Sequence, residues 1–122
     1  MDIRIQLVLS LIERDIRSTL EPRAMADEIR LSLSRFYDLF RRETGTVPAR
    51  YLRSLRLQKA QELLVNSQLS VKEIAGSVGI CDVSHFVRYF EKMYGVSPRR
   101  FRRATVSSSE IVDSAGKIAN KS

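Results

Sequence analysis

The side chains that most often perform chemistry in proteins are scarce in this 122-residue chain, which holds one His and one Cys. Because His85 and Cys81 are the only residues of their types, the chain can form neither an intramolecular disulfide nor a zinc-type site built from its own Cys and His ligands. No second His and no acid pair accompanies His85, so the groups needed for nucleophilic or acid-base catalysis are missing. We therefore predict a protein that is not an enzyme and that holds no metal or cofactor. Cys81 is expected to be a small buried packing residue in a turn, with redox sensing as the alternative.

Basic side chains are in excess: the chain has 21 Lys and Arg against 14 Asp and Glu, a net charge of +7. An excess of this kind indicates a polyanionic partner such as nucleic acid or an acidic membrane surface. Residues 1–47 hold 8 basic and 8 acidic residues, residues 48–105 hold 11 and 4, and residues 106–122 hold 2 of each. The excess positive charge therefore lies entirely in residues 48–105.

The longest apolar stretch near the N-terminus, residues 7–12, is far shorter than the roughly 20 residues that cross a bilayer. No basic segment followed by a small-residue cleavage site is present, so we predict neither a signal peptide nor a membrane association. A single unpaired Cys is typical of a reducing compartment. The sequence predicts a soluble cytoplasmic protein.

Helical periodicity dominates, since apolar residues recur at i, i+3 and i+4 and only 5 Gly and 3 Pro are present. The fold class is all-α. We predict helices over residues 3–17, 22–29, 33–43, 48–65, 70–78 and 83–94, and one further turn over residues 97–101. Ser70 with Glu73 forms a capping box, and Asp82 is the N-cap of the helix that follows. The buried stripe of that helix is expected to contain Phe86, Tyr89, Phe90 and Met93.

An internal repeat organises these helices. The residues that recur at an offset of fifty are Phe36, Phe40, Gly45, Pro48 and Tyr51, which match Phe86, Phe90, Gly95, Pro98 and Phe101. Each half consists of a short helix, a tight turn and a longer helix, which is a helix-turn-helix. We predict a first subdomain over residues 1–47, a linker helix over 48–65, a second subdomain over 66–105 and a Ser-rich flexible tail over 106–122. Within this tail, a transient helix over residues 110–119 is the alternative.

A helix-turn-helix reads DNA with its second helix, so the residues opposite the buried stripe are candidates for base contacts. On the first such helix these are Ser34, Tyr37, Asp38 and Arg41; on the second they are Ser84, Val87, Arg88 and Glu91, flanked by Val83 and His85. Arg88 can donate two hydrogen bonds to guanine, and Val87 can contact a thymine methyl group. The competing role for Arg88 is an ion pair with Glu91, and the competing interpretation for the whole set is an ordinary solvated face.

Further basic residues are predicted to bind backbone phosphates and to position the protein without specifying sequence. They are Arg35, Arg41, His85 and Lys92 on the two helices, Arg50, Arg53, Arg56 and Lys59 on the linker, and the cluster Arg99, Arg100, Arg102 and Arg103. For the linker helix, the alternative is a charged face that contacts only solvent.

The second unit closely resembles the signature of the AraC/XylS family of bacterial transcription regulators. The resemblance lies in Ile74-Ala75-Gly76-Ser77-Val78-Gly79-Ile80, in the run from Asp82 to Pro98, and in Phe101-Arg102. The first unit matches through Phe40-Arg41-Arg42-Glu43-Thr44-Gly45, and the likeness extends over about residues 3–104.

The resemblance implies a seven-helix DNA-binding domain whose two recognition helices enter successive major-groove segments of promoter DNA, roughly 34 Å apart. Base contacts carried over by position fall at Ser34, Tyr37, Asp38, Val83, Ser84, Val87 and Arg88. Members of the family usually contact RNA polymerase, often as activators, and many have a separate effector or dimerisation domain. The sequence does not indicate an effector pocket. The chain looks like either a small stand-alone member or an excised C-terminal domain.

Two residues depart from the pattern. Arg30 stands where the second unit has Gly79, so the first turn must adopt another backbone conformation or tolerate strain at a non-Gly residue. Asp38 stands where the family often has a basic residue; it can accept from cytosine or pair with a neighbouring Arg. With the neutral charge of residues 1–47, this suggests that the second unit anchors the protein and the first discriminates weakly.

Overall fold

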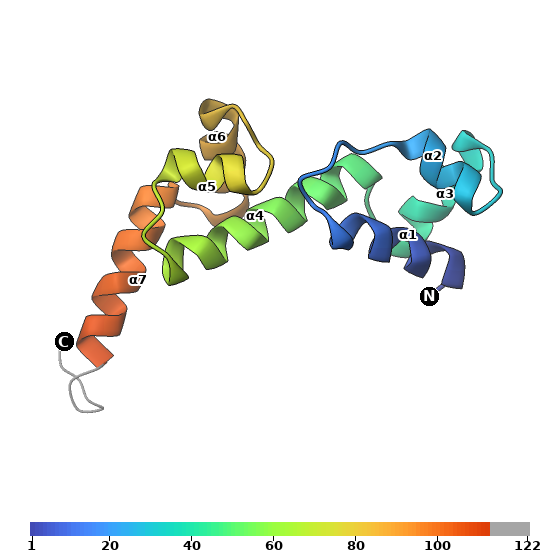
Figure 1. Cartoon of the computed structure of the whole chain (residues 1–122). Helices are drawn as coiled ribbons and strands as arrows, with labels where there is room; N and C mark the ends of the chain where they lie inside the picture. The colour runs from blue at the N-terminus through green and yellow to red at the C-terminus, as the bar shows by residue number, and fades with distance from the viewer. Residues whose placement is uncertain (113–122) are drawn as a thin grey trace. The chain divides into compact units, whose positions relative to one another are not determined.

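The computed structural model describes the backbone of residues 1–112 and the side chains of residues 1–105, and within these residues it contains seven α-helices and no strand (Figure 1). The helices are α1 (Ile3–Arg14), α2 (Pro22–Glu28), α3 (Leu33–Thr44), α4 (Pro48–Asn66), α5 (Val71–Ser77), α6 (Val83–Tyr94) and α7 (Pro98–Val112). The predicted all-α class is confirmed. Across residues 1–112, none of the helices combines the length and apolar character that a membrane crossing requires.

The chain divides into two compact units between Arg56 and Leu57, in the middle of α4. The first unit consists of α1, α2, α3 and the N-terminal half of α4, and the second consists of the remainder of α4 with α5, α6 and α7. The helix predicted over residues 48–65 is present, but it is not a separate linker. Its first half belongs to one core and its second half to the other.

The core of the first unit is a single apolar cluster. Its fully or nearly fully buried members are Ile5, Val8, Ile12, Ala26, Ile29, Phe36, Phe40 and Leu52, which come from all four helical segments. Burying one large apolar side chain contributes about 1.5–3 kcal/mol, so helices too short to be stable alone hold one another in place. In the second unit the buried apolar residues are Leu57, Ala60, Leu64, Ile74, Ala75, Val78, Phe86 and Phe90.

Aromatic contacts repeat in the two units and give the sequence repeat a physical basis. Phe40 lies with its ring centroid 5.8 Å from Phe36 and 5.8 Å from Tyr51, in edge-to-face arrangements. Phe90 lies 6.0 Å from Phe86 and 5.7 Å from Phe101. Such pairs add about 0.5–1.5 kcal/mol beyond the burial of their area. The same three positions therefore join the recognition helix to the helix that follows it in each unit.

The two recognition helices, α3 and α6, begin and end in the same way. Ser32 caps α3 by accepting from the backbone N–H of Arg35 at 3.2 Å, and Asp82 caps α6 by accepting from that of His85 at 3.1 Å. Both helices end at a left-handed Gly, Gly45 (φ 80°) and Gly95 (φ 84°). The predicted caps and the Ser70–Glu73 capping box are confirmed.

The tight turn before each recognition helix also has the same backbone conformation. Arg30 has φ 61° where Gly79 has φ 90°, and the next N–H bonds back to Ala26 and to Ala75, respectively, at 2.9 Å in both units. Of the two possibilities that the sequence left open for Arg30, the structure shows the second. A non-Gly residue occupies the left-handed region, at a cost of about 1–2 kcal/mol.

Several local predictions were wrong. The first helix was predicted to reach residue 17 but ends at Arg14. Just after it, the Asp15 carboxylate accepts from the backbone N–H of Arg17 and from the Ser18 hydroxyl. The last helix continues from Phe101 to Val112, so residues 106–112 are helical, and the predictions for residues 113–122 lie outside the described residues. Met93 is 41% exposed and Cys81 is exposed, so neither is the buried residue that periodicity predicted.

Candidate nucleic-acid interface

The outward face of α3 holds the residues predicted to read DNA in the first unit. Ser34, Asp38 and Arg41 are exposed, whereas Tyr37 is half-buried with its ring 5.8 Å from that of Phe36. The buried Phe36 and Phe40 fix the helix from behind, since α3 packs on both α1 and α2. The polar residues are thus exposed to solvent on a helix held in place by its packing, and Tyr37 exposes only part of its surface.

The outward face of α6 is arranged in the same way. Ser84, Arg88 and Glu91 are exposed, and Val83 and Val87 are half-buried. Val87 is therefore half-buried like Tyr37, and only part of its surface is available to a thymine methyl group. The structure brings the predicted residues of each unit onto one helix face.

Arg88 does not form the ion pair with Glu91 that was its competing role. Within the described residues, the ion pairs of the second unit are Lys59 with Glu62 at 3.5 Å and His85 with Asp82 at 3.4 Å. The pKa of Asp82 is lowered, chiefly by the hydrogen bond from the backbone N–H of His85 and less by the charges of His85 and Arg88. The Arg88 side chain is exposed, so its guanidinium donors can reach a ligand.

His85 contributes to the same end of α6. Its ring stacks on Tyr89 with centroids 6.0 Å apart and planes 21° apart, while Nδ1 lies 3.4 Å from the Asp82 carboxylate. Half of the His85 side chain is exposed. A ring N–H of a His so placed can donate to an anion that approaches the start of α6.

Asp38 has none of the ion pairs that the sequence offered it. In the described part of the chain, no carboxylate-guanidinium contact within ion-pair distance joins it to Arg35, Arg41 or Arg42. The carboxylate is exposed at the centre of the outward face of α3. It is therefore available to accept a hydrogen bond, as cytosine readout would require.

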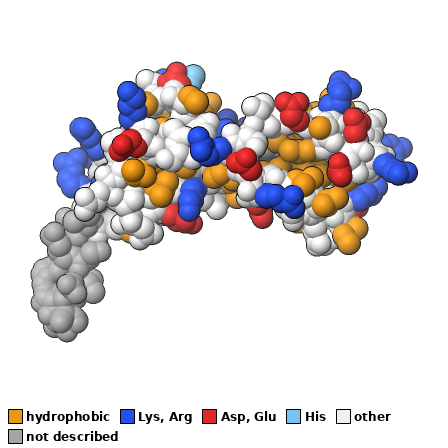
Figure 2. Space-filling model, in the orientation of Figure 1, with side chains coloured by type: hydrophobic (Ala, Val, Ile, Leu, Met, Phe, Trp, Pro, Cys, Tyr) orange, Lys and Arg blue, Asp and Glu red, His pale blue; other side chains and the backbone are white. Residues whose placement is uncertain are grey.

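The residues predicted to bind phosphate differ in exposure. Nine are exposed, namely Arg35, Arg41, Arg50, Lys59, His85, Lys92, Arg99, Arg100 and Arg103. The half-buried ones are Arg53, Arg56 and Arg102. On the visible face in Figure 2, Lys and Arg side chains of the first unit are interspersed with Asp and Glu side chains.

Arg56 and Arg102 have a structural role that the sequence did not reveal. Arg56 donates to the carbonyl oxygens of Ile16 and Ser18 at 2.5 and 3.0 Å, and Arg102 donates to those of Leu64 and Ser67 at 3.0 and 3.3 Å. The carbonyls bound by Arg56 lie in the loop that follows α1, and those bound by Arg102 lie in the last turn of α4 and just after it. Each guanidinium thus uses some of its N–H groups in hydrogen bonds within the protein, and the charge pattern of the sequence does not indicate these bonds.

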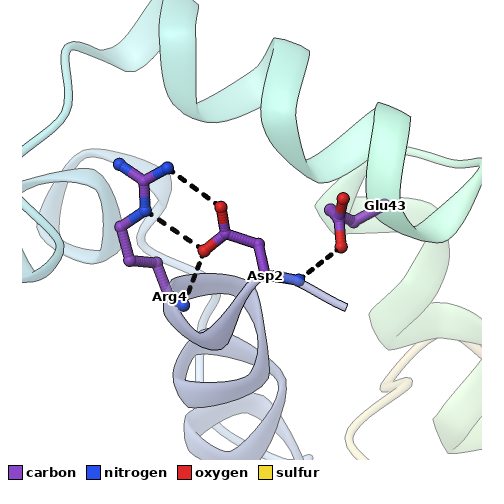
Figure 3. A network of polar contacts seen from close by, with 3 residues as sticks. All are labelled: Asp2, Arg4 and Glu43. Carbon is purple, nitrogen blue, oxygen red and sulfur yellow. Dashed lines mark hydrogen bonds and ion pairs between the residues drawn. The ribbon is translucent and has the colours of Figure 1, made fainter.

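A polar network at the start of α1 was also missed. Arg4 donates to both carboxylate oxygens of Asp2, and the backbone N–H of Asp2 donates to Glu43 at 2.6 Å (Figure 3). The hydrogen bonds from Arg4 lower the pKa of Asp2 to about 2. Because Glu43 lies in the last turn of α3, this network joins the start of α1 to the end of the recognition helix.

No set of three His, Cys, Asp or Glu side chains in the described part of the chain converges as metal ligands would. The arrangement instead offers donors and acceptors on two exposed helix faces, with arginines around them. Such faces suit the edges of base pairs and the phosphates beside them.

Comparison with known proteins gives a consistent picture. Residues 25–104 match the model of a family described as a helix-turn-helix domain. Over 100 residues the chain is 37% identical to the HTH-type transcriptional activator RhaS of Escherichia coli O9:H4 (strain HS), an alignment that covers 82% of this chain and 36% of RhaS. The chain thus spans little more than a third of the length of this relative.

Two solved structures share the fold. One is a transcriptional regulator of Chromobacterium violaceum from the AraC-type DNA-binding domain-containing proteins, with a TM-score of 0.77 and 27% identity, covering 84% of this chain and 91% of that one. The other is the DNA-binding domain of the global transcriptional factor AdpA in complex with a target DNA, with a TM-score of 0.76 and 28% identity, covering 83% and 91%.

Proposed function

Since the chain belongs to the AraC/XylS family of helix-turn-helix DNA-binding domains, we propose that it regulates transcription by binding a specific double-stranded DNA sequence with both recognition helices. The observation that carries this proposal is the repeated geometry. In both units an aromatic-backed helix, preceded by the same turn and cap, exposes one polar face. The family and the relatives are regulators, so no catalytic activity is proposed.

Base readout is assigned to the exposed residues of the two faces. In the first unit these are Ser34 and Asp38, with the accessible part of Tyr37; in the second they are Ser84 and Arg88, with the accessible parts of Val83 and Val87. Arg88 selects guanine through two donors, and Asp38 selects cytosine by accepting from its amino group. Successive major-groove segments then present the two halves of an asymmetric site.

Backbone contacts are assigned mainly to the second unit and to α4. Arg99 and Arg100 are exposed in the first turn of α7, where the helix N-terminus itself attracts phosphate. The positive excess of residues 48–105 adds an electrostatic attraction that does not depend on sequence. Arg56 and Arg102 already donate to carbonyl oxygens, so for these two residues only the remaining N–H groups are assigned to phosphate.

Contact with RNA polymerase and action in the bacterial cytoplasm on the nucleoid are proposed from the family resemblance, and activation at a promoter is proposed from the resemblance and from RhaS. RhaS is a transcriptional activator, but this chain spans 36% of its length. Activation by this chain is therefore tested separately from DNA binding, in a purified transcription reaction with and without the protein.

A protein-interaction module with no DNA readout is the competing function, since helix-turn-helix faces can also bind another protein. Titration of the chain with random duplex at two salt concentrations separates the two. DNA binding predicts that the logarithm of the affinity falls with the logarithm of the salt concentration, by about 0.9 per phosphate neutralised. Replacing Arg99 and Arg100 by Ala should reduce that slope by about 2 for all sequences alike. An affinity insensitive to salt would favour the protein-interaction module.

A further inference from the structure

A hollow of about 350 Å³ opens beside the recognition helix of the first unit. It is lined by Arg4 of α1, by Leu31 of the turn, and by Arg35, Asp38, Leu39 and Arg42 of α3. We call this site the arginine hollow. Three of the eight basic residues of residues 1–47, a segment of zero net charge, meet there, so this neutral segment still has a concentrated positive site.

The arginine hollow lies on the flank of α3 that runs from the base-reading face toward α1. At about 100° per residue, Arg42 and Arg35 are about 40° and 60° around the helix from Asp38, and Leu39 lies a further step toward the core. When a helix lies in the major groove, its outer face meets base edges and its flanks face the phosphates of the two strands. The hollow is therefore on the side of α3 where a strand backbone would pass.

The arginines are available for such a contact. Arg35 and Arg42 are exposed, and within the described residues neither forms an ion pair with a carboxylate. Arg4 donates through Nε and Nη2 to Asp2, at 3.2 and 2.9 Å, which leaves three of its five N–H groups. Because Asp2 is in turn tied to Glu43 of α3, the Arg4 guanidinium is held in position relative to the recognition helix (Figure 3).

The second unit has basic residues on the matching flank of α6. Fifty residues after Arg35 and Arg42 stand His85 and Lys92, both exposed. The base-reading position between them differs in sign, Asp38 in one unit and Arg88 in the other. Basic character on the flank thus persists where the charge on the reading face does not, as expected if the flank contacts a constant ligand and the face a variable one.

We propose that the arginine hollow binds a phosphate of the DNA backbone, with Arg42 and Arg35 donating from α3 and Arg4 from α1. This inference rests on the proposed function and adds Arg4 and Arg42 to the contacts of the first unit. The three guanidiniums offset the repulsion between Asp38 and the same strand, so that the carboxylate can approach a base. The occupant is a phosphodiester of the duplex; a free phosphate ion has the same chemistry and is tested as a separate ligand.

The test measures the salt dependence of duplex binding by the whole chain for Arg42→Ala, Arg4→Ala and a matched control, Arg14→Ala. Arg14 is an exposed arginine at the other end of α1, outside the arginine hollow. We expect Arg42→Ala to weaken binding about 3- to 10-fold and to reduce the salt slope by about 0.9, equally for selected and random duplexes. Arg4→Ala should act in the same direction, and Arg14→Ala should leave both quantities unchanged. Thermal melting of each variant checks that the fold is intact, and Arg42→Lys should restore the slope.

Three results would overturn the proposal. If the unmodified chain binds duplex but Arg42→Ala and Arg14→Ala have the same slope, the arginine hollow does not bind backbone while the proposed function stands. If inorganic phosphate perturbs the NMR signals of the arginine hollow in unmodified protein without competing with duplex, the site takes small anions instead. If the unmodified chain does not bind duplex at all, the proposed function and this inference both fail.

Discussion

In the first unit, Asp38 and Arg41 lie one turn apart on the exposed face of α3; in the second, Arg88 and Glu91 occupy the equivalent positions of α6. The order of charges is therefore reversed between the two recognition helices. The residues behind them are not, because Phe36 and Phe40 correspond to Phe86 and Phe90, all fully buried. Packing constrains the residue type at core positions, whereas the residue type at exposed positions depends on the ligand that the face contacts.

The two units also differ in what surrounds the recognition helix. The second has four arginines at the start of α7, at positions where the first has Ala49, Arg50, Leu52 and Arg53. The first has instead the arginine hollow on one flank of α3. We infer that the second unit provides most of the affinity and that the first adds a local grip and a preference at its own half of the site.

The largest expected effects come from the cores that the two units share. Phe40→Ala and Phe90→Ala should each lower the free energy of unfolding of their own unit by about 3–5 kcal/mol, because both rings are fully buried and both join two helices. Denaturant unfolding followed by residue-resolved NMR measures the two units separately. Met93→Ala, at an exposed position, is the control and should change little. Unequal losses for the two Phe variants would show that the cores are not equivalent.

Next in size are the reading faces. Arg88→Ala should cost about 1–3 kcal/mol of binding free energy and relax one base preference. Asp38→Ala should relax a preference in the other half of the site with little loss of affinity, because it also removes a charge that repels phosphate. Binding to a selected duplex and to its single-base variants measures both. An Arg88→Ala protein with unchanged affinity and preference would refute the assignment of Arg88 to base readout.

Smaller opposite effects are expected at the two turns. Gly79→Ala should destabilise the second unit by about 1 kcal/mol, because the residue has φ 90°. Arg30→Gly should stabilise the first unit by less than this, since relief of strain at φ 61° is partly offset by the greater freedom of Gly in the unfolded chain. Thermal melting of the two variants measures the sign of each change in stability. A clear loss of stability in Arg30→Gly would mean that the Arg30 side chain makes a stabilising contact.

The smallest effect distinguishes the two N-caps by pH. The folded-state pKa of Asp82 is lowered from 3.8, so its cap is fully formed above about pH 4 and is lost as the pH falls through the lower folded value. Ser32 does not titrate in this range. Between pH 5 and pH 2, Cα chemical shifts should show the first turn of α6 fraying before that of α3. Asp82→Asn, a cap without a charge, should remove the difference; fraying of α6 at the same pH in this variant would contradict the explanation.

Helix positions, caps and turns were predictable because each depends on a few neighbouring residues. The period of Phe36 and Phe40, the cap at Asp82 and the Gly at 45 and 95 determine local structure without reference to the rest of the chain. Arg30 shows the limit of this reasoning. The repeat located its turn, but only the structure showed that Arg adopts the conformation for which Gly is usually needed.

Burial and pairing were less predictable, because they depend on which segments meet. Met93 follows Phe86 by seven residues and so shares its helix face, yet it is exposed, since periodicity does not show whether a neighbour covers that end of the helix. The charges of Arg56 and Arg102 did not reveal that their guanidiniums bind carbonyl oxygens. The base-reading faces were predicted from the same periodicity that identified the core, and their ligands remain proposals.

Selection of bound duplexes from a random pool, carried out with the unmodified chain and with Arg88→Ala, tests the central claim most directly. Two unequal recognition helices predict an asymmetric site with two blocks of preferred bases about one helical turn apart. The block that Arg88→Ala erases should contain guanine and should be the more strongly selected of the two. A pool with no enriched sequence, or with a single block that Arg88→Ala leaves intact, would contradict the account.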